Sequence, residues 1–98
     1  MAGLEFTWDP AKARTNLRKH GVSFVEAQSV FYDVRARLVD DPDHSESEDR
    51  FILLGLSEAA RLLIVVHAYR EPDGLIRIIS ARKATTKERT GYERGPRP

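Results

Sequence analysis

The chain has 98 residues, of which 41% are hydrophobic and 32% charged, and its formal net charge is +1. This length suits one domain over residues 1–98, and the composition excludes a disordered chain and a membrane-spanning protein. The absence of cysteine excludes disulfides, thiolate zinc sites and a cysteine nucleophile. No apolar stretch marks an N-terminal secretion signal, so we expect a cytoplasmic protein. We also expect the C-terminal tail, residues 94–98, to be frayed.

The small net charge conceals a sorted distribution of charged residues. Residues 40–50 carry six acidic side chains and one basic side chain, whereas residues 77–98 carry seven basic and two acidic side chains. A near-neutral total argues against a nucleic-acid-binding protein, but the locally basic C-terminal segment keeps that class of function open.

The N-terminal residues predict a short strand and a helix. Apolar and polar residues alternate over residues 4–8, which is typical of a half-buried strand. Asp9 can cap a helix and Pro10 suits its first position, because the missing amide of proline has no partner there. We expect this helix to run to His20 and to end at Gly21, which tolerates a left-handed conformation.

A second helix is predicted directly after the first. Ser23 and Glu26 have the spacing of a capping box, and apolar residues recur behind them at helical spacing. The helix should end near Tyr32 and Asp33. Residues 37–40 then predict a strand.

Three further strands are predicted over residues 50–56, 61–69 and 75–83. The turns between them, residues 57–60 and 71–74, are so short that consecutive strands must be antiparallel neighbours.

The last predicted element is a short basic helix that runs to about Tyr92 and begins at a second capping box, Thr85 with Glu88. The complete order predicts an α+β domain, with two N-terminal helices on one face of an antiparallel sheet. The other face is then available for a ligand.

The acidic segment, residues 40–49, invites comparison with a calcium-binding loop. Three oxygen-bearing side chains match positions 1, 3 and 5 of an EF-hand: Asp41, Asp43 and Ser45. Glu46 stands where the loop needs glycine, and Ile52 stands where it needs glutamate. We therefore expect no metal site and interpret the segment as a solvated loop or as an acidic patch for a basic partner.

The three histidines do not cluster by spacing, so nothing local proposes a zinc site. His20 ends the first helix, His44 lies in the acidic segment, and His67 interrupts an apolar strand. Two readings of His67 stay open: a core histidine with a satisfied hydrogen bond, or a titratable group on an open sheet face, suited to proton transfer.

Basic side chains mark the last predicted strand. Without a bulge, strand alternation puts Arg77 and Lys83 on one face and Arg82 on the other. These charges either protect an edge strand from aggregation or bind phosphate, with Lys87 and Arg89 extending the patch.

Taken together, these residues resemble a known family, the BrnT toxins, over positions 5 to about 93. The matching segments stand in order: Phe6-x-Trp8-Asp9-x-x-Lys12-x-x-x-Asn16-x-x-Lys19-His20-Gly21-Val22-Ser23-Phe24, Ala27, Phe31, Arg50-Phe51, Gly55, Val65-Val66-His67, Arg77-Ile78-Ile79-Ser80-Ala81-Arg82-Lys83-Ala84, Glu88-Arg89 and Tyr92. The resemblance implies a RelE-like fold and a ribonuclease that inhibits translation as the toxin of a type II toxin–antitoxin pair.

RNA cleavage without a metal needs a base for the 2′-hydroxyl, cations for the phosphate and an acid for the leaving oxygen. If the resemblance holds, we expect His67 to transfer the proton. The expected charge-stabilising residues are Arg77, Arg82 and Lys83, and the expected RNA-binding residues are Lys19, His20, Lys87 and Arg89. Lys12, Glu88 and Tyr92 also match the family, and structural roles explain them equally well. Trp8 is expected in the core.

The resemblance also implies a partner and no cofactor. A BrnA-like antitoxin of the ribbon-helix-helix class should bind two toxin copies in a complex with two copies of each chain, cover residues 77–92 and bind operator DNA. Because the net charge is small, we expect the isolated chain to bind free RNA weakly. One alternative stays open, a non-catalytic module that binds nucleic acid or a partner protein. A metal hydrolase built on the acidic segment is disfavoured, because that segment lacks the diagnostic positions of a metal-binding loop.

Overall fold

The computed structural model describes residues 3–39, 50–70 and 74–95, so the acidic segment and His44 lie outside the described residues. In chain order the elements are β1 (Phe6–Thr7), α1 (Pro10–His20), α2 (Phe24–Ser29), the 3-10 turn η1 (Val30–Tyr32), β2 (Arg37–Val39), β3 (Phe51–Leu56), β4 (Leu62–Arg70), β5 (Leu75–Lys83) and α3 (Thr86–Arg94). The predicted α+β class and element order are confirmed. The first strand is shorter than predicted, and α3 extends to Arg94, which therefore belongs to the helix and not to a frayed tail.

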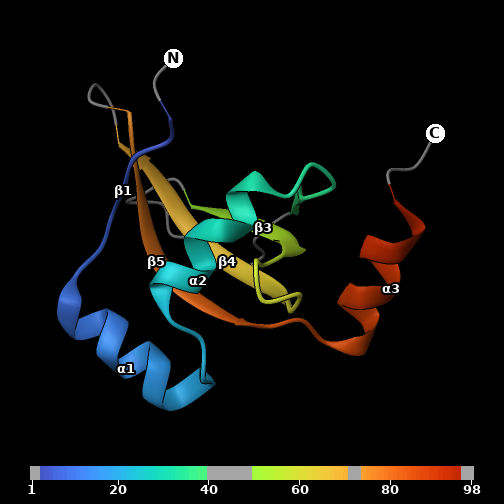
Figure 1. The fold of residues 1–98 in the computed structure, drawn as a ribbon, viewed down its shortest axis with the longest axis horizontal. Helices are drawn as coiled ribbons and strands as arrows, with labels where there is room; N and C mark the ends of the chain where they lie inside the picture. The colour runs from blue at the N-terminus through green and yellow to red at the C-terminus, as the bar shows by residue number, and fades with distance from the viewer. Residues whose placement is uncertain (1–2, 40–49, 71–73, 96–98) are drawn as a thin grey trace.

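The strands form one five-stranded mixed sheet in the order β1-β5-β4-β3-β2 (Figure 1). Strands β2 to β5 are antiparallel neighbours, which confirms the predicted meander. β1 joins the opposite edge and runs parallel to β5, with Phe6 beside Ile76. The sequence alone does not predict this pair, because two residues carry too little periodicity to reveal a partner.

The ends of α1 follow the predicted capping chemistry. The Asp9 carboxylate accepts a hydrogen bond of 2.9 Å from the Ala11 amide, and Pro10 begins the helix. Gly21 ends it with φ of 70°, and its amide donates to the Leu17 carbonyl at 2.9 Å. The left-handed conformation at this position explains the glycine.

The two predicted capping boxes have different outcomes. Thr85 and Glu88 form the complete reciprocal pair at the start of α3. At the start of α2, the Ser23 hydroxyl accepts from the Glu26 amide at 3.0 Å. The Glu26 carboxylate, however, binds Arg61, so the second half of that predicted box is wrong.

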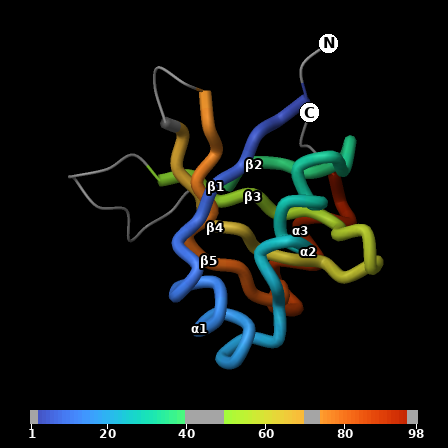
Figure 2. Tube along the Cα trace, turned by 60° about the vertical axis from the view of Figure 1, so that its left-hand side comes forward, coloured from blue at the N-terminus to red at the C-terminus, as the bar shows by residue number. Residues whose placement is uncertain are grey.

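Helices α1 and α2 cover one face of the sheet and enclose the main core. In Figures 1 and 2 α1 lies beside β5, and α2 follows it across the strands. The buried core side chains come from α2, the residues flanking it and one face of β3, β4 and β5: Val22, Phe24, Ala27, Val30, Leu53, Leu63, Val65, Ile78 and Ala81. Trp8 packs against this core, with its ring 5.9 Å from that of Phe24, as predicted.

Gly55 allows the chain before β2 to approach the sheet closely. A Cβ atom at Gly55 would lie 2.8 Å from the Ala36 side chain and 2.8 Å from that of Val30. Such contacts are sterically forbidden, so this position requires glycine for packing.

The second face of the sheet is only partly open. A smaller cluster of Leu54, Leu62 and Ile64 lies there, and Tyr92 of α3 packs against it. The expectation that this whole face is available to a ligand is therefore wrong where α3 lies. No helix within the described residues is long and apolar enough to cross a membrane.

Candidate functional site

His67 lies in the helix-covered core. It is 6% exposed, and its ring centroid lies 4.7 Å from that of Phe31 and 6.0 Å from that of Phe51. Its Nδ1 atom is 3.3 Å from the Val65 carbonyl oxygen. Burial lowers the pKa of His67 below 6.5, against the smaller effect of the Val65 contact, so the ring is neutral at neutral pH. The placement of His67 on an open sheet face is wrong, because strand alternation aligns it with buried Val65.

An irregularity in β5 changes which residues share a face. Val66 of β4 pairs with Ser80, but the next residue, His67, pairs with Ile78. Ile79 is therefore an extra residue, as in a β-bulge. It shifts the alternation of side chains along β5 by one position.

The bulge places Arg77 and Arg82 on the same side of β5. Ile78 and Ala81 are both buried in the core under the helices, although they are three positions apart. Arg77 precedes Ile78 and Arg82 follows Ala81, so both arginines lie on the second face. The alternation predicted for an unbroken strand is therefore wrong.

Lys83 points to the helix-covered side, two positions after Ala81. Its charge contributes to lowering the pKa of Glu26 on α2, after the larger effect of the Arg61 hydrogen bond. Lys83 is exposed but is separated from Arg82 by the sheet.

Arg82 is held by a carboxylate of α3. Its Nη1 and Nη2 atoms donate to Glu88 Oε1 and Oε2 at 2.9 and 3.0 Å. The hydrogen bonds from Arg82, followed by those from Thr85, lower the pKa of Glu88 to about 2. This bidentate pair joins β5 to α3, so a phosphate that bound Arg82 would compete with Glu88.

The remaining predicted cations of this region are dispersed. Lys87 lines a shallow groove of about 410 Å³ between α3 and the second face of the sheet, together with Glu88 and Gly91. Arg89 points away from that groove and lies 3.9 Å from Glu93, with both side chains more than half exposed. Neither Arg77 nor Arg89 is among the residues that line this groove.

Tyr92 helps to hold α3 in place. Its hydroxyl donates to Asp33 Oδ2 at 2.7 Å, and burial and this carboxylate raise its pKa. Arg37 donates to the carbonyls of Gly91 and Gly95 at 3.2 and 2.9 Å. These contacts tie α3 to the segment around β2.

A second groove lies between α1 and the edge of β5 and has a volume of about 320 Å³. It combines predicted RNA-binding residues with residues to which the sequence assigned no role: Ala11, Lys12, Thr15, Asn16, Lys19, His20, Ile79 and Ser80. The sequence predicts Lys19 and His20 near the end of a helix. It does not predict their position beside β5, because that contact joins distant parts of the chain.

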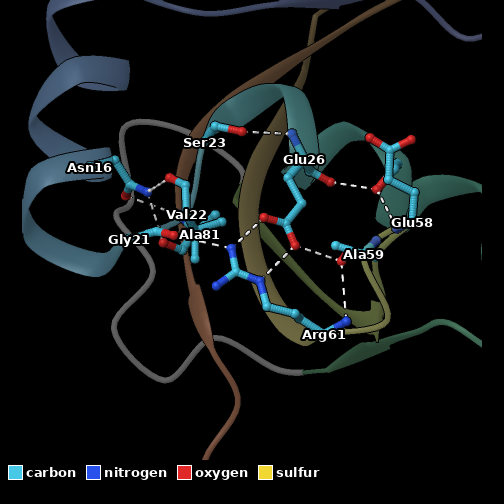
Figure 3. A network of polar contacts seen from close by, with 11 residues as sticks. Asn16, Gly21, Val22, Ser23, Glu26, Glu58, Ala59, Arg61 and Ala81 are labelled. Atoms are coloured by element: carbon cyan, nitrogen blue, oxygen red, sulfur yellow. Dashed lines mark hydrogen bonds and ion pairs between the residues drawn. The ribbon is translucent and has the colours of Figure 1, made fainter.

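Asn16 fixes the position of α1 against β5 (Figure 3). Its Nδ2 group donates to the carbonyls of Val22 and Ala81 at 2.9 and 2.8 Å, and its Oδ1 atom accepts from the Ala81 amide at 3.1 Å. The side chain is buried, with 6% exposure. It satisfies the backbone groups of Ala81 on the outer edge of β5, which β1 does not reach because it pairs only with Ile76 and Arg77.

The same view shows an ion pair that the sequence did not reveal (Figure 3). Glu26 of α2 binds Arg61 through both carboxylate oxygens, and the Ser57 hydroxyl donates to it at 2.6 Å. Arg61 also donates to the Gly21 carbonyl at 3.1 Å. The network joins α2 and the end of α1 to the β3–β4 hairpin.

The charge of the α1 groove is positive. Within Pro10–His20 the helix carries four lysine and arginine residues and no aspartate or glutamate. Lys12 and Lys19 line the groove, whereas Arg14 and Arg18 of the same helix do not. Among the residues described, no carboxylate forms an ion pair with Lys12, Lys19 or His20. No group of three or more potential metal ligands is found among the described residues.

The fold and this groove define a small α+β protein with a cationic surface suited to a polyanion such as nucleic acid. Comparison with known families then gives a specific assignment. The chain belongs to the BrnT family, described as the ribonuclease toxin of type II toxin–antitoxin systems, which matches residues 8–88. This confirms the family resemblance seen in the sequence, and the family implies an RNA target and an antitoxin partner.

A solved structure supports the fold. The crystal structure of the Brucella abortus ribonuclease toxin BrnT is similar to this chain with a TM-score of 0.64 and 21% sequence identity. The similarity covers 86% of this chain and 100% of that chain. No curated protein sequence is significantly similar to this chain.

Proposed function

We propose that this chain is an endoribonuclease that inhibits translation in the cytoplasm and is the toxin of a type II toxin–antitoxin pair. The observation that carries this proposal is the BrnT family match over residues 8–88. The cations of α1, β5 and α3 support it, because phosphate contacts dominate the affinity of proteins for nucleic acids.

The proposed reaction does not use a metal. A side chain removes the proton from a ribose 2′-hydroxyl, and the resulting oxygen attacks the adjacent phosphorus. Cationic side chains stabilise the charge on the phosphate oxygens. The products are a 2′,3′-cyclic phosphate and a 5′-hydroxyl end. For charge stabilisation and RNA binding we propose the predicted cations that are accessible at least in part: Lys19, Arg77, Arg82, Lys83, Lys87 and Arg89. His20 is an accessible imidazole beside Lys19.

His67 is not part of this proposal. With 6% exposure and Phe31 against its ring, it cannot reach a ribose without an opening of the core. We assign it a structural role.

The test uses the purified chain with end-labelled RNA, in buffer and with EDTA. Cleavage in both conditions, with cyclic phosphate ends, supports a metal-independent ribonuclease. Loss of cleavage with EDTA that Mg²⁺ restores contradicts the metal-free reaction. RNA binding without any cleavage favours a non-catalytic binding module.

We also propose a cognate antitoxin of the ribbon-helix-helix class. Since such proteins dimerise through their DNA-binding part, the complex would contain two copies of each chain and bind operator DNA through the antitoxin. Co-purification with the product of the neighbouring reading frame, followed by mass measurement in solution, tests this. A complex of one copy of each chain contradicts the stoichiometry.

A further inference from the structure

We propose that the groove between α1 and β5 is where RNA is cleaved, with Lys12 and Lys19 binding the phosphate backbone and His20 accepting the 2′-hydroxyl proton. This inference rests on the proposed ribonuclease function and assigns its site. It differs from the sequence prediction, which placed proton transfer at His67.

Accessibility separates the two histidines that the structure describes. His67 is enclosed by Phe31 and Phe51. His20 is half-buried, lies on the last turn of α1 and lines the groove. An imidazole can accept and donate protons at neutral pH, but only where a substrate can reach it.

The charges beside His20 are arranged for a polyanion. Lys12 and Lys19 are seven residues apart on α1, which corresponds to about 10.5 Å along a helix axis. Their ammonium groups therefore contact different phosphates of one strand. Because the described residues offer these lysines no carboxylate partner, binding RNA breaks no ion pair there. Arg82, in contrast, is already engaged by Glu88.

The groove is held by contacts on both sides. Asn16 locks the middle of α1 to Ala81, and Ser80 and the bulged residue Ile79 line the wall of the groove on β5. Arg61 donates to the carbonyl of Gly21, next to His20. These contacts fix the catalytic helix against the strand, so the side chains are positioned before RNA binds.

The proposed step balances in atoms and charge. His20 takes the proton of the 2′-hydroxyl as the bond from O2′ to phosphorus forms. The bond from phosphorus to O5′ breaks, and the leaving O5′ takes a proton from a solvent water. His20 then gives its proton to the hydroxide ion left by that water, which restores both. Lys12 and Lys19 offset the negative charge on the phosphate oxygens throughout. No oxidant, reductant or co-reactant other than water is required.

The experiment compares wild type with the variants His20→Ala, Lys12→Ala and Lys19→Ala, and with Arg18→Ala as the matched control. Arg18 is an exposed cation on the same helix but outside the groove. Thermal unfolding of each variant checks that the fold is retained. Single-turnover cleavage and RNA affinity across a salt series are then measured separately.

We expect His20→Ala to lower the cleavage rate by on the order of 100-fold, with RNA affinity within about threefold of wild type. Added imidazole should restore part of the rate. Lys12→Ala and Lys19→Ala should each weaken RNA binding and reduce the slope of log affinity against log salt by about 1. Arg18→Ala should match wild type in both measurements.

The outcomes separate this inference from the proposed function. If wild type cleaves RNA and folded His20→Ala cleaves at the same rate, the assignment of His20 is overturned and the ribonuclease function stands. If the wild type cleaves no RNA, the function and the role of His20 both fail. An unchanged salt slope in both lysine variants overturns the backbone-binding role of the groove whether or not cleavage occurs.

Discussion

Asn16 shows how one side chain can replace a missing strand. Its amide makes three hydrogen bonds, to the carbonyls of Val22 and Ala81 and to the Ala81 amide, at a point of the sheet edge that β1 does not reach. Glutamine carries the same amide group, with its donor and acceptor in one plane, but its side chain is one methylene longer.

The first prediction follows from these bonds. Asn16→Ala should lower the free energy of unfolding by about 2–3 kcal/mol, because it leaves buried backbone groups without partners. Urea denaturation monitored by circular dichroism measures the change. Arg18→Ala, on the exposed side of the same helix, is the control and should shift the free energy by less than about 0.5 kcal/mol. A loss at Asn16 no greater than in the control would contradict the strand-replacement role.

His67 gives the second prediction, a dependence of stability on pH. Because burial lowers the pKa of His67 in the folded state, the unfolded chain binds the proton more readily. The contribution of the neutral His67 ring to the free energy of unfolding is fully present above the ordinary histidine pKa of 6.5, and it is lost as the pH falls below that value. We expect the free energy of unfolding to decrease from pH 7 to pH 5.

His67→Leu should flatten that part of the profile, because the variant has no imidazole to protonate. The carboxylates of Glu26 and Glu88, with pKa values lowered from 4.5, act at lower pH. Urea midpoints of both proteins at several pH values make the comparison. Parallel profiles between pH 7 and pH 5 would show that His67 is not the group responsible.

At the scale of the elements, α3 depends on side chains that reach it from the sheet. It has nine residues, and none of them is buried. A helix of this length is marginal in isolation, so its position depends on contacts from Arg82, Asp33 and Arg37.

The third prediction concerns the pair of Arg82 with Glu88. Glu88→Gln should destabilise the chain by about 1 kcal/mol, since solvent screens a pair this exposed. Because the folded pKa of Glu88 is lowered to about 2, the wild-type contribution is present above 4.5 and is lost as the pH falls toward 2. Hydrogen exchange should show faster exchange of α3 amides in the variant at pH 7.

Glu93→Gln is the matched control, because Glu93 lies on the same helix and its nearest Arg89 nitrogen is 3.9 Å away. Equal exchange rates in the two variants would mean that Arg82 does not anchor α3.

Local signals predicted the elements well but not the contacts between distant ones. Asp9, Gly21 and Thr85 act within a few residues of themselves, so capping rules placed both ends of α1 and the start of α3 correctly. The faces of β5 were predicted wrongly, because the bulge at Ile79 is set by pairing with β4 and leaves no periodic mark.

The candidate site was predicted in part for the same reason. Lys19 and His20 were recognised as basic residues, but the groove also needs Ile79 and Ser80. His67 has the right chemistry for proton transfer, and only the tertiary structure shows that Phe31 covers it.

At the scale of the whole molecule, the cations are divided among several surfaces. Lys12 and Lys19 lie in the α1 groove, Arg82 lies on the second face, and Lys83 lies on the helix-covered side. The net charge of +1 is the sum of basic and acidic side chains over the whole chain, so it does not describe the charge of any one surface. Local fields, which salt screens beyond about 8 Å, govern contact with a charged partner.

The fourth prediction applies to the proposed antitoxin complex. Hydrogen exchange of residues 77–92 should slow when the antitoxin binds, because the partner is expected to cover the cations of β5 and α3. Exchange rates that stay unchanged in this segment, in a complex that no longer cleaves RNA, would show that neutralisation acts elsewhere. Protection confined to α1 would instead place the inhibitor over the proposed groove.

The parallel pairing of β1 with β5 also determines when the chain can fold during its own synthesis. Phe6 leaves the ribosome long before its neighbour Ile76. A nascent chain that extends only to β4 has no partner for its first strand, and Asn16 has no Ala81 to bind. The α1 groove requires Ile79 and Ser80 as its second wall, so it forms only after β5 has emerged. The ribosome that makes this protein is therefore not exposed to a finished groove until Ile79 and Ser80 have left its exit tunnel.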